Sequence, residues 1–237
     1  MSEGVLIKNT IDLSQSCQIR NTLRQLIFIC AILLSISVNA QRSKQLYNRI
    51  GIQGLYTLTS LHTDNFQTAQ TAGFLAGLST RGAFYNNFDL IYGIDFLQTD
   101  LEIQGREEAI AYTLSGVQVK LLANYLIAGE NLSVEFGPIL QVNGGLKLDD
   151  QNQANAIVDG YTLLQAEDLE EISRVNGILT AGITGGFNWL RLTAGYQYNF
   201  TNILNRLNKE DLNLKDPAAT NFKGNLGLIT AGMVLYL

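Results

Sequence analysis

Apolar and polar residues alternate along much of this chain with a period of two. The clearest run spans residues 190–200, where one face carries Leu190, Leu192, Ala194, Tyr196, Tyr198 and Phe200. The other face of the same run carries Arg191, Thr193, Gly195, Gln197 and Asn199. Because successive side chains of a β-strand point to opposite faces, the run predicts a strand with one apolar and one polar face.

Seven further segments repeat the pattern, near residues 50–58, 74–78, 88–96, 117–125, 132–142, 179–187 and 225–237. With the run at 190–200 they make eight strands of roughly ten residues each, the length that a tilted strand needs to cross a bilayer. An even strand number is typical of single-chain bacterial membrane barrels. The sequence therefore predicts an all-β fold, an eight-stranded antiparallel up-and-down transmembrane barrel.

The predicted connections alternate between short and long. Short breaks fall near 85–87, 128–131 and 186–188, and the longer ones are 62–71, 98–112, 146–174 and 201–223. Membrane barrels have tight turns at one end and longer outside loops at the other. We therefore expect the apolar faces to meet lipid, with Leu190, Leu192, Tyr196, Tyr198 and Phe200 facing the bilayer. In a soluble lipocalin-like barrel, the open alternative, these faces would point inward.

The first forty residues have the features of a cleaved signal peptide. Arg20 and Arg24 precede an apolar run at 26–38, and small residues at Val38 and Ala40 precede Gln41. An apolar run of this length is too short for a membrane-spanning helix, which needs about 20 residues. We predict two parts, a lead and signal peptide (1–40) and a barrel domain (41–237). Export and a membrane barrel together predict location in the outer membrane.

Charge and cysteine content exclude several classes of protein. The formal net charge of −5 argues against a nucleic-acid partner, which normally requires a basic surface. Both cysteines, Cys17 and Cys30, fall in the predicted leader, so the exported part has no disulfide framework and no cysteine-based zinc site.

The polar faces of the strands predict a network inside the barrel. Its members are Arg81, Asp89, Asp95, Lys120, Glu135, Arg191 and Gln197. A barrel of eight strands is just wide enough for side chains to fill it, so these residues are expected to plug the lumen rather than line a solute path. Lys120 and Glu135 lie on neighbouring predicted strands, and we expect them to share one network, within about 8 Å of each other.

No catalytic constellation is evident, so we predict that the protein is not an enzyme and has no catalytic residues. The single histidine, His62, has no positioned partner in the sequence pattern and is expected to be a surface residue. The acidic loop 146–174 could suit calcium, but it lacks EF-hand spacing. We expect a solvated outside loop, with a short helix around 166–174, and no metal or other cofactor.

Several strings resemble the PorT-like family of outer-membrane β-barrels, common in Bacteroidetes. They are Gly-Phe-Leu-Ala-Gly-Leu at 73–78, Phe-Asp-Leu-Ile-Tyr-Gly at 88–93, Val-Glu-Phe-Gly-Pro-Ile at 134–139 and Ala-Gly-Tyr-Gln-Tyr-Asn-Phe-Thr-Asn-Ile at 194–203. The resemblance covers most of residues 45–237 and implies an outer-membrane barrel. Family members include a component linked to a secretion machine, a role that we do not transfer.

These observations favour a non-enzymatic, monomeric outer-membrane barrel that contacts lipid. Such a barrel would reach an envelope protein partner through loops 146–174 and 201–223. The alternatives are a small-solute transport or pore protein, the soluble lipocalin-like binder, and an outer-membrane hydrolase. A pore is disfavoured because water-filled channels generally need more strands, and a hydrolase because no Ser, Asp or His cluster is evident.

Overall fold

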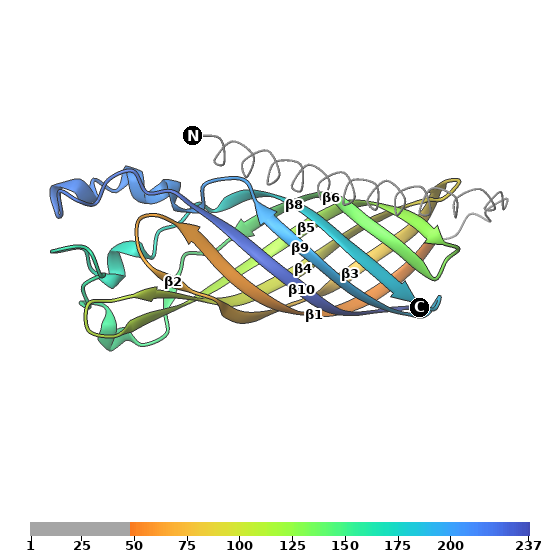
Figure 1. The fold of residues 1–237 in the computed structure, drawn as a ribbon, viewed down its shortest axis with the longest axis horizontal. Coiled ribbons are helices and arrows are strands. Elements are labelled where there is room, and N and C mark those ends of the chain that lie inside the picture. Colours follow the sequence, from red (N-terminus) through yellow and green to blue (C-terminus); the bar gives the residue numbers. More distant parts are fainter. Residues whose placement is uncertain (1–47) are drawn as a thin grey trace, which may run out of the picture. The chain divides into compact units, whose positions relative to one another are not determined.

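The computed structural model describes residues 48–237, which form an all-β fold (Figure 1). The predicted signal peptide and its cleavage point lie outside the described residues. The eight long strands are β1 (Asn48–Thr63), β3 (Thr71–Tyr85), β4 (Phe88–Gln104), β5 (Ala109–Ala128), β6 (Leu132–Asn143), β8 (Val175–Gly186), β9 (Leu190–Asn199) and β10 (Gly224–Tyr236). The connections hold the short strands β2 (Thr68–Ala69) and β7 (Lys147–Leu148) and the 3-10 helices η2 (Gln151–Gln153), η3 (Ala166–Leu169), η4 (Ile203–Lys209) and η5 (Leu212–Leu214).

The long strands form one closed antiparallel sheet. Neighbours pair in the order β1–β3–β4–β5–β6–β8–β9–β10, and β10 returns to pair with β1 from Gly51↔Tyr236 to Thr63↔Gly224. This closure confirms the predicted eight-stranded barrel. It also leaves no open sheet edge along the barrel wall, where an unpaired backbone group in lipid would cost several kcal/mol.

The two ends of the barrel differ in their connections. At one end, here the turn end, three short turns join β3 to β4, β5 to β6 and β8 to β9. Asn86 (φ 42°) and Gly129 (φ 60°) occupy the left-handed conformations that tight turns use and that these residue types tolerate. The opposite, loop end carries segments 64–70, 144–174 and 200–223.

The predicted long loop at 98–112 is wrong. β4 continues to Gln104 and β5 begins at Ala109, so only residues 105–108 connect them. In the sequence, the polar residues of this stretch that point outward favour a loop. Their inward neighbours, such as Leu101 and Tyr112, are buried in a core that no single segment reveals.

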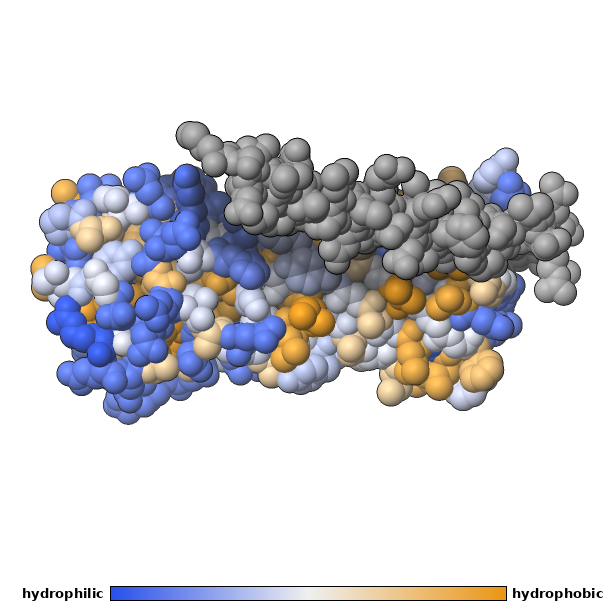
Figure 2. Space-filling model, in the orientation of Figure 1, coloured by the Kyte–Doolittle hydropathy of each residue, from blue (hydrophilic) through white to orange (hydrophobic). Residues whose placement is uncertain are grey.

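The outer surface of the turn-end half is apolar. Of the residues predicted to face lipid, Leu192, Tyr196, Tyr198 and Phe200 are exposed on this surface and Leu190 is partly exposed. Other exposed members include Ile50, Ile52, Tyr56, Phe74, Leu78, Tyr92, Ile94, Phe96, Val117, Val119, Leu121, Phe136, Leu140, Val142, Leu179, Ile183, Ile229, Met233 and Leu235. We call this surface the apolar belt. Figure 2 shows hydrophobic residues toward the turn end, at right, and mostly hydrophilic residues at the loop end.

The belt has the height of a membrane core. It covers roughly nine to eleven residues of each strand, which at about 3.3 Å per residue and a tilt of about 40° spans about 25 Å. This is the height of the apolar band on membrane barrels. A soluble barrel would not expose such a continuous band, so the structure disfavours the lipocalin-like alternative.

Polarity reverses along the strands above the belt. On β4 the outward side changes from Phe96 to Gln98, while the inward side changes from Asp95 to Leu97. On β5, which pairs with it, the inward residue Leu114 is fully buried at the same end. Each of these strands therefore has two halves. In one, the outward side chains meet lipid and the inward ones are polar; in the other, the outward side chains meet water and the inward ones are apolar.

The loop end is a folded unit with a hydrophobic core. The core joins inward residues of the strands to loop residues that include Leu146, Leu148, Val158, Leu164, Leu169, Ile172, Ile203, Leu204, Leu207 and Phe222. We call these loops with their core the loop cap. The expectation of a simply solvated loop at 146–174 is wrong, because many apolar residues of this loop are buried. The helix expected around 166–174 is only the single 3-10 turn η3.

Candidate functional site

The structure places all seven residues of the predicted network on inward positions of the strands. Arg81, Asp89, Asp95, Lys120, Arg191 and Gln197 are buried, and Glu135 is partly buried. They fall into separate groups at different levels of the lumen. Each group contains at least one residue that the sequence pattern did not single out.

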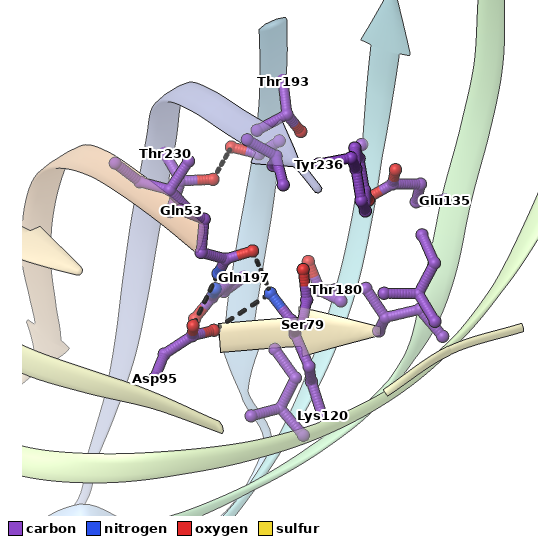
Figure 3. A pocket seen from close by; sticks show the side chains of 17 residues that line it. Gln53, Ser79, Asp95, Lys120, Glu135, Thr180, Thr193, Gln197, Thr230 and Tyr236 are labelled. Atoms are coloured by element: carbon purple, nitrogen blue, oxygen red, sulfur yellow. Dashed lines mark hydrogen bonds and ion pairs between the residues drawn. The ribbon is translucent and has the colours of Figure 1, made fainter. Parts of the chain in front are cut away.

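An ion pair lies inside the lumen between the neighbouring strands β5 and β4 (Figure 3). Lys120 Nζ lies 3.0 Å from Asp95 Oδ2 and donates to Gln53 Oε1 at 2.7 Å. Gln53 Nε2 donates in turn to Asp95 Oδ1 at 2.6 Å. Gln53 comes from β1, which does not pair with β4 or β5, so its contacts join strands that are not neighbours in the sheet. Buried charges need such a set of partners, because removing them from water costs several kcal/mol per ion.

Two glycines make room for this ion pair. A Cβ added at Gly77, which pairs with Asp95, would lie 2.2 Å from Asp95 Oδ1. A Cβ added at Gly93, which pairs with Lys120, would lie 3.0 Å from Lys120 Cε. The inward positions beside the charged pair are therefore kept empty. The sequence showed these glycines as part of the polar face but not what they accommodate.

A layer of amides lies beside the ion pair. Gln118 Nε2 donates to Gln141 Oε1 at 2.7 Å and to Gln197 Oε1 at 3.0 Å, and Gln141 Nε2 donates to Asn143 Oδ1 at 2.7 Å. The contacts join β5 and β6 to β9, which pairs with neither. This layer ties opposite walls of the lumen together by neutral hydrogen bonds.

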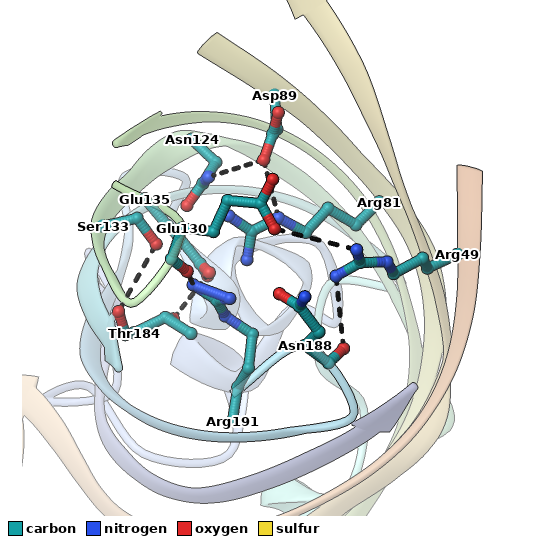
Figure 4. Close-up of polar contacts among 10 residues, drawn as sticks. All are labelled: Arg49, Arg81, Asp89, Asn124, Glu130, Ser133, Glu135, Thr184, Asn188 and Arg191. Atoms are coloured by element: carbon teal, nitrogen blue, oxygen red, sulfur yellow. Dashed lines mark hydrogen bonds and ion pairs between the residues drawn. The ribbon is translucent and has the colours of Figure 1, made fainter. Parts of the chain in front are cut away.

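Charged side chains converge at the turn end (Figure 4). Arg81 Nε donates to Asp89 Oδ2 at 2.7 Å, and both side chains are buried. Arg49 Nη2 lies 3.7 Å from Glu130 Oε2, and Arg191 Nη2 donates to the backbone oxygen of Glu130. The β5–β6 turn is therefore held by arginines from β1 and β9.

Lys120 and Glu135, which we expected to share one network, line the same cavity, but their hydrogen bonds go to different partners. Lys120 contacts Asp95 and Gln53, whereas Glu135 Oε1 accepts a hydrogen bond from Thr184 Oγ1 at 2.5 Å. Glu135 pairs with Asn124, four residues along β5 from Lys120, or about 13 Å at the usual rise of a strand. Sequence adjacency of two strands does not reveal this offset in register.

Little open space remains in the lumen. A cavity of about 50 Å³, measured as the volume open to the centres of water molecules, lies between the ion pair and the turn-end charges. Its walls include Ser79, Glu135, Gln197 and Tyr236 (Figure 3). The volume suits a few waters or one small solute. At this level the side chains of the strands therefore leave room for only a small volume.

A carboxylate fastens the two largest loops of the cap together. Asp216 Oδ2 accepts from the backbone N–H groups of Thr162 at 2.6 Å and Leu163 at 2.8 Å. Hydrogen bonds from the backbone N–H groups of Leu163 and Ala218, above all, hold the pKa of Asp216 below its ordinary value. Loops 146–174 and 201–223, both predicted to contact a partner, are therefore joined to each other.

The described residues contain no group of three or more His, Cys, Asp or Glu side chains placed to hold a metal ion. His62 lies exposed near the loop end of β1. Among residues 48–237, no helix is long and apolar enough to cross a membrane.

The closed sheet, the apolar belt and the polar lumen define the class of protein: a transmembrane β-barrel of the kind found in outer membranes. No protein-family model matches the chain, and no curated protein matches it either.

Among solved structures the chain is similar to three outer-membrane proteins. Neisserial surface protein A shares 14% identity over 78% of this chain and 96% of its own, with a TM-score of 0.46. Ail, the attachment invasion locus protein of Yersinia pestis, in complex with sucrose octasulfate, shares 15% identity over 82% and 100%, with a TM-score of 0.46. OprG of Pseudomonas aeruginosa shares 10% identity over 80% and 95%, with a TM-score of 0.45. The assignment of class rests on the strand pairing and the belt described above.

Proposed function

We propose that this chain is a non-enzymatic, monomeric outer-membrane barrel of PorT-like kind that presents its loop cap to an envelope protein partner. The observation that carries the proposal is the cap itself. A hydrophobic core joins the loops to the upper strands and holds them in one arrangement. Ordered loops on a rigid barrel are a preorganised binding surface, which loses less entropy on association than mobile loops do.

Support for the PorT-like kinship comes from the strings quoted above, and their positions in the barrel agree with it. The string at 73–78 lies in β3, the string at 88–93 begins β4, and the string at 134–139 lies in β6. The string at 194–203 ends β9 and enters the second large loop of the cap.

The cap exposes two leucines that the membrane does not cover. Leu163 is 53% exposed and Leu214 is 83% exposed, one in each large loop. Asp216 binds the backbone N–H of Leu163, and Lys215 Nζ contacts Gln165 and Asp168, so both loops are pinned beside these leucines. Exposed apolar side chains held rigidly are typical anchors of protein–protein contacts. We propose this surface as the contact site.

A pore is the second candidate, and two features oppose it. Amide hydrogen bonds cross the lumen beside the ion pair of Lys120 and Asp95, and the apolar core of the loop cap covers the loop end. Conductance across planar bilayers tests this directly. Stable open steps from the purified barrel would support a pore and contradict a purely partner-binding role.

Photo-crosslinking in intact cells tests the partner site. A photoreactive residue at position 163 should give a discrete adduct, because Leu163 would lie within the contact. The same residue at Ala109, which is exposed at the loop end on β5, serves as the matched control and should give none. A Leu214→Asp exchange should abolish the adduct at 163 while leaving the barrel folded. If that exchange leaves the adduct unchanged, or position 109 gives the same adduct, the proposed site is wrong.

A further inference from the structure

A buried arginine near the turn end has donors without acceptors. Arg81 is 2% exposed, and its Nε is engaged by Asp89. Its Nη1 and Nη2 atoms have no hydrogen-bond partner among the described residues. These two atoms carry four of the five guanidinium N–H groups. Because leaving donors of a buried charged group unsatisfied costs free energy, Arg81 requires an acceptor that residues 48–237 do not provide.

Further donors surround this guanidinium. Ser79 lies two residues earlier on the same face of β3, and its buried hydroxyl faces the side chain of Tyr236. Tyr236 lies close enough to Arg81 and Arg191 for electrostatic interaction, and it lines the lumen cavity together with Ser79. Figure 4 shows Arg81 and Arg191 pointing from different walls toward the middle of the barrel. Guanidinium and hydroxyl donors from β3, β9 and β10 thus converge.

The chemistry of this group selects for an oxyanion. A guanidinium fork donates two parallel hydrogen bonds and matches the oxygens of a phosphate or carboxylate. A hydroxyl such as that of Ser79 adds a donor to the same ligand. The nearby carboxylate of Glu135 accepts a hydrogen bond from Thr184 and can accept another from the P–OH group of a partly protonated ligand such as hydrogen phosphate.

The site is reachable from the turn end. At the loop end the core of the cap covers the barrel. At the turn end the closing ion pair between Arg49 and Glu130 is long, 3.7 Å, and its side chains are 25% and 41% exposed. Partly exposed ion pairs contribute little to stability, so this contact can open readily.

We infer that the barrel binds a small free oxyanion of phosphate type inside the lumen, held by the Nη atoms of Arg81 and by Ser79. The ligand enters from the turn end past Arg49 and Glu130. This inference does not depend on the proposed partner of the loop cap, which lies at the other end of the barrel.

Nuclear magnetic resonance of the arginine side chains tests the site. The ¹⁵N-labelled full barrel, in maltoside micelles that contain no phosphate, is titrated with inorganic phosphate while the Nε–Hε signals are followed. The Arg81 signal should shift saturably, and sodium chloride at equal ionic strength should not reproduce the shift. Sodium acetate serves as a second arm: a shift of equal affinity would show a general carboxylate site and overturn the assignment to phosphate-type anions.

Three variants separate binding from folding. Arg81→Lys keeps a positive charge beside Asp89 but lacks the fork, and Ser79→Ala removes one donor. Each should weaken phosphate binding by about tenfold or more, the loss expected for a hydrogen bond to a charged group. In Arg81→Lys, which lacks the Arg81 signal, the Nε–Hε signal of Arg191 reports binding. Arg174→Gln, at an exposed loop-end arginine, is the matched control and should not change affinity. The proposal fails if wild type shows no saturable shift, if chloride gives the same shift, or if both lumen variants, folded by amide dispersion, bind like wild type.

Discussion

The direction of the apolar belt can be tested with one substitution, Ala194→Arg. Ala194 points outward from β9 and pairs with Ala231 on β10 and Ile183 on β8. The belt on this strand runs from Leu190 to Phe200, so Ala194 lies about one residue, or about 2.5 Å in height, from its centre. An arginine there faces the middle of the bilayer rather than its interface.

The expected cost follows from that depth. Arginine on the lipid face of a barrel costs about 2–4 kcal/mol at the midplane and about 0–1 kcal/mol near the interfaces. A loss of this size lowers the folding equilibrium constant by roughly 30- to 900-fold. Ala109→Arg is the matched control, because Ala109 also points outward but lies roughly 20 Å above the belt. It should cost less than about 0.5 kcal/mol, as exposed surface substitutions usually do.

Equilibrium unfolding by urea in lipid vesicles measures both variants. The single tryptophan, Trp189, is exposed at the turn end, and its emission reports insertion. The reasoning is refuted if Ala194→Arg is no less stable than Ala109→Arg, because the outward face of β9 would then not meet lipid.

Three further outcomes are expected. Asp95→Asn should destabilise the barrel by about 3–5 kcal/mol in the same urea titration, because Lys120 then stays buried without a counter-charge, and Asp95→Leu with Lys120→Leu should recover most of the loss. Leu114→Ala, at a fully buried cap position, should cost about 2–5 kcal/mol and speed protease cleavage of the loops before that of the barrel. The loop cap should become less resistant to an acid-active protease as the pH drops below 3.8, the ordinary pKa of Asp216. Folding lowers the pKa of this carboxyl, so its ionised form stabilises the cap above pH 3.8 and the stabilisation is lost as the group becomes protonated. Asp216→Asn should lack this acid-dependent step, and an unchanged step would contradict the role of Asp216.

The charged groups of the lumen and the core of the cap have different roles in stability. Lumen contacts such as Lys120 with Asp95 satisfy charges that the barrel must bury, and they contribute little net free energy compared with apolar packing. The core of the cap removes apolar surface from water, which is the larger favourable contribution. The lumen contacts thus serve mainly to satisfy buried charges, whereas the core of the cap stabilises the loops.

Much of the barrel was predictable from local pattern. The period of two assigns Leu192 to one face and Arg191 to the other wherever the strand lies, because successive side chains of a strand must alternate. Strand number and the short turns followed from the same alternation. The lumen residues were also predictable as a set, since the polar face of every strand must point into the barrel once the apolar faces meet lipid.

Partners and register depended on the tertiary structure. Lys120 meets Asp95 and Gln53 rather than Glu135, because the offset between strands and the crossing of the lumen involve residues far apart in the chain. The loop cap was missed for the same reason: its polar outward and apolar inward residues come from several segments, and none forms a core alone. Sequence alternation thus determines the two faces of each strand. Closure of the sheet and folding of the loops decide whether each part of a strand face meets lipid, water or protein. They also decide which side chains contact one another.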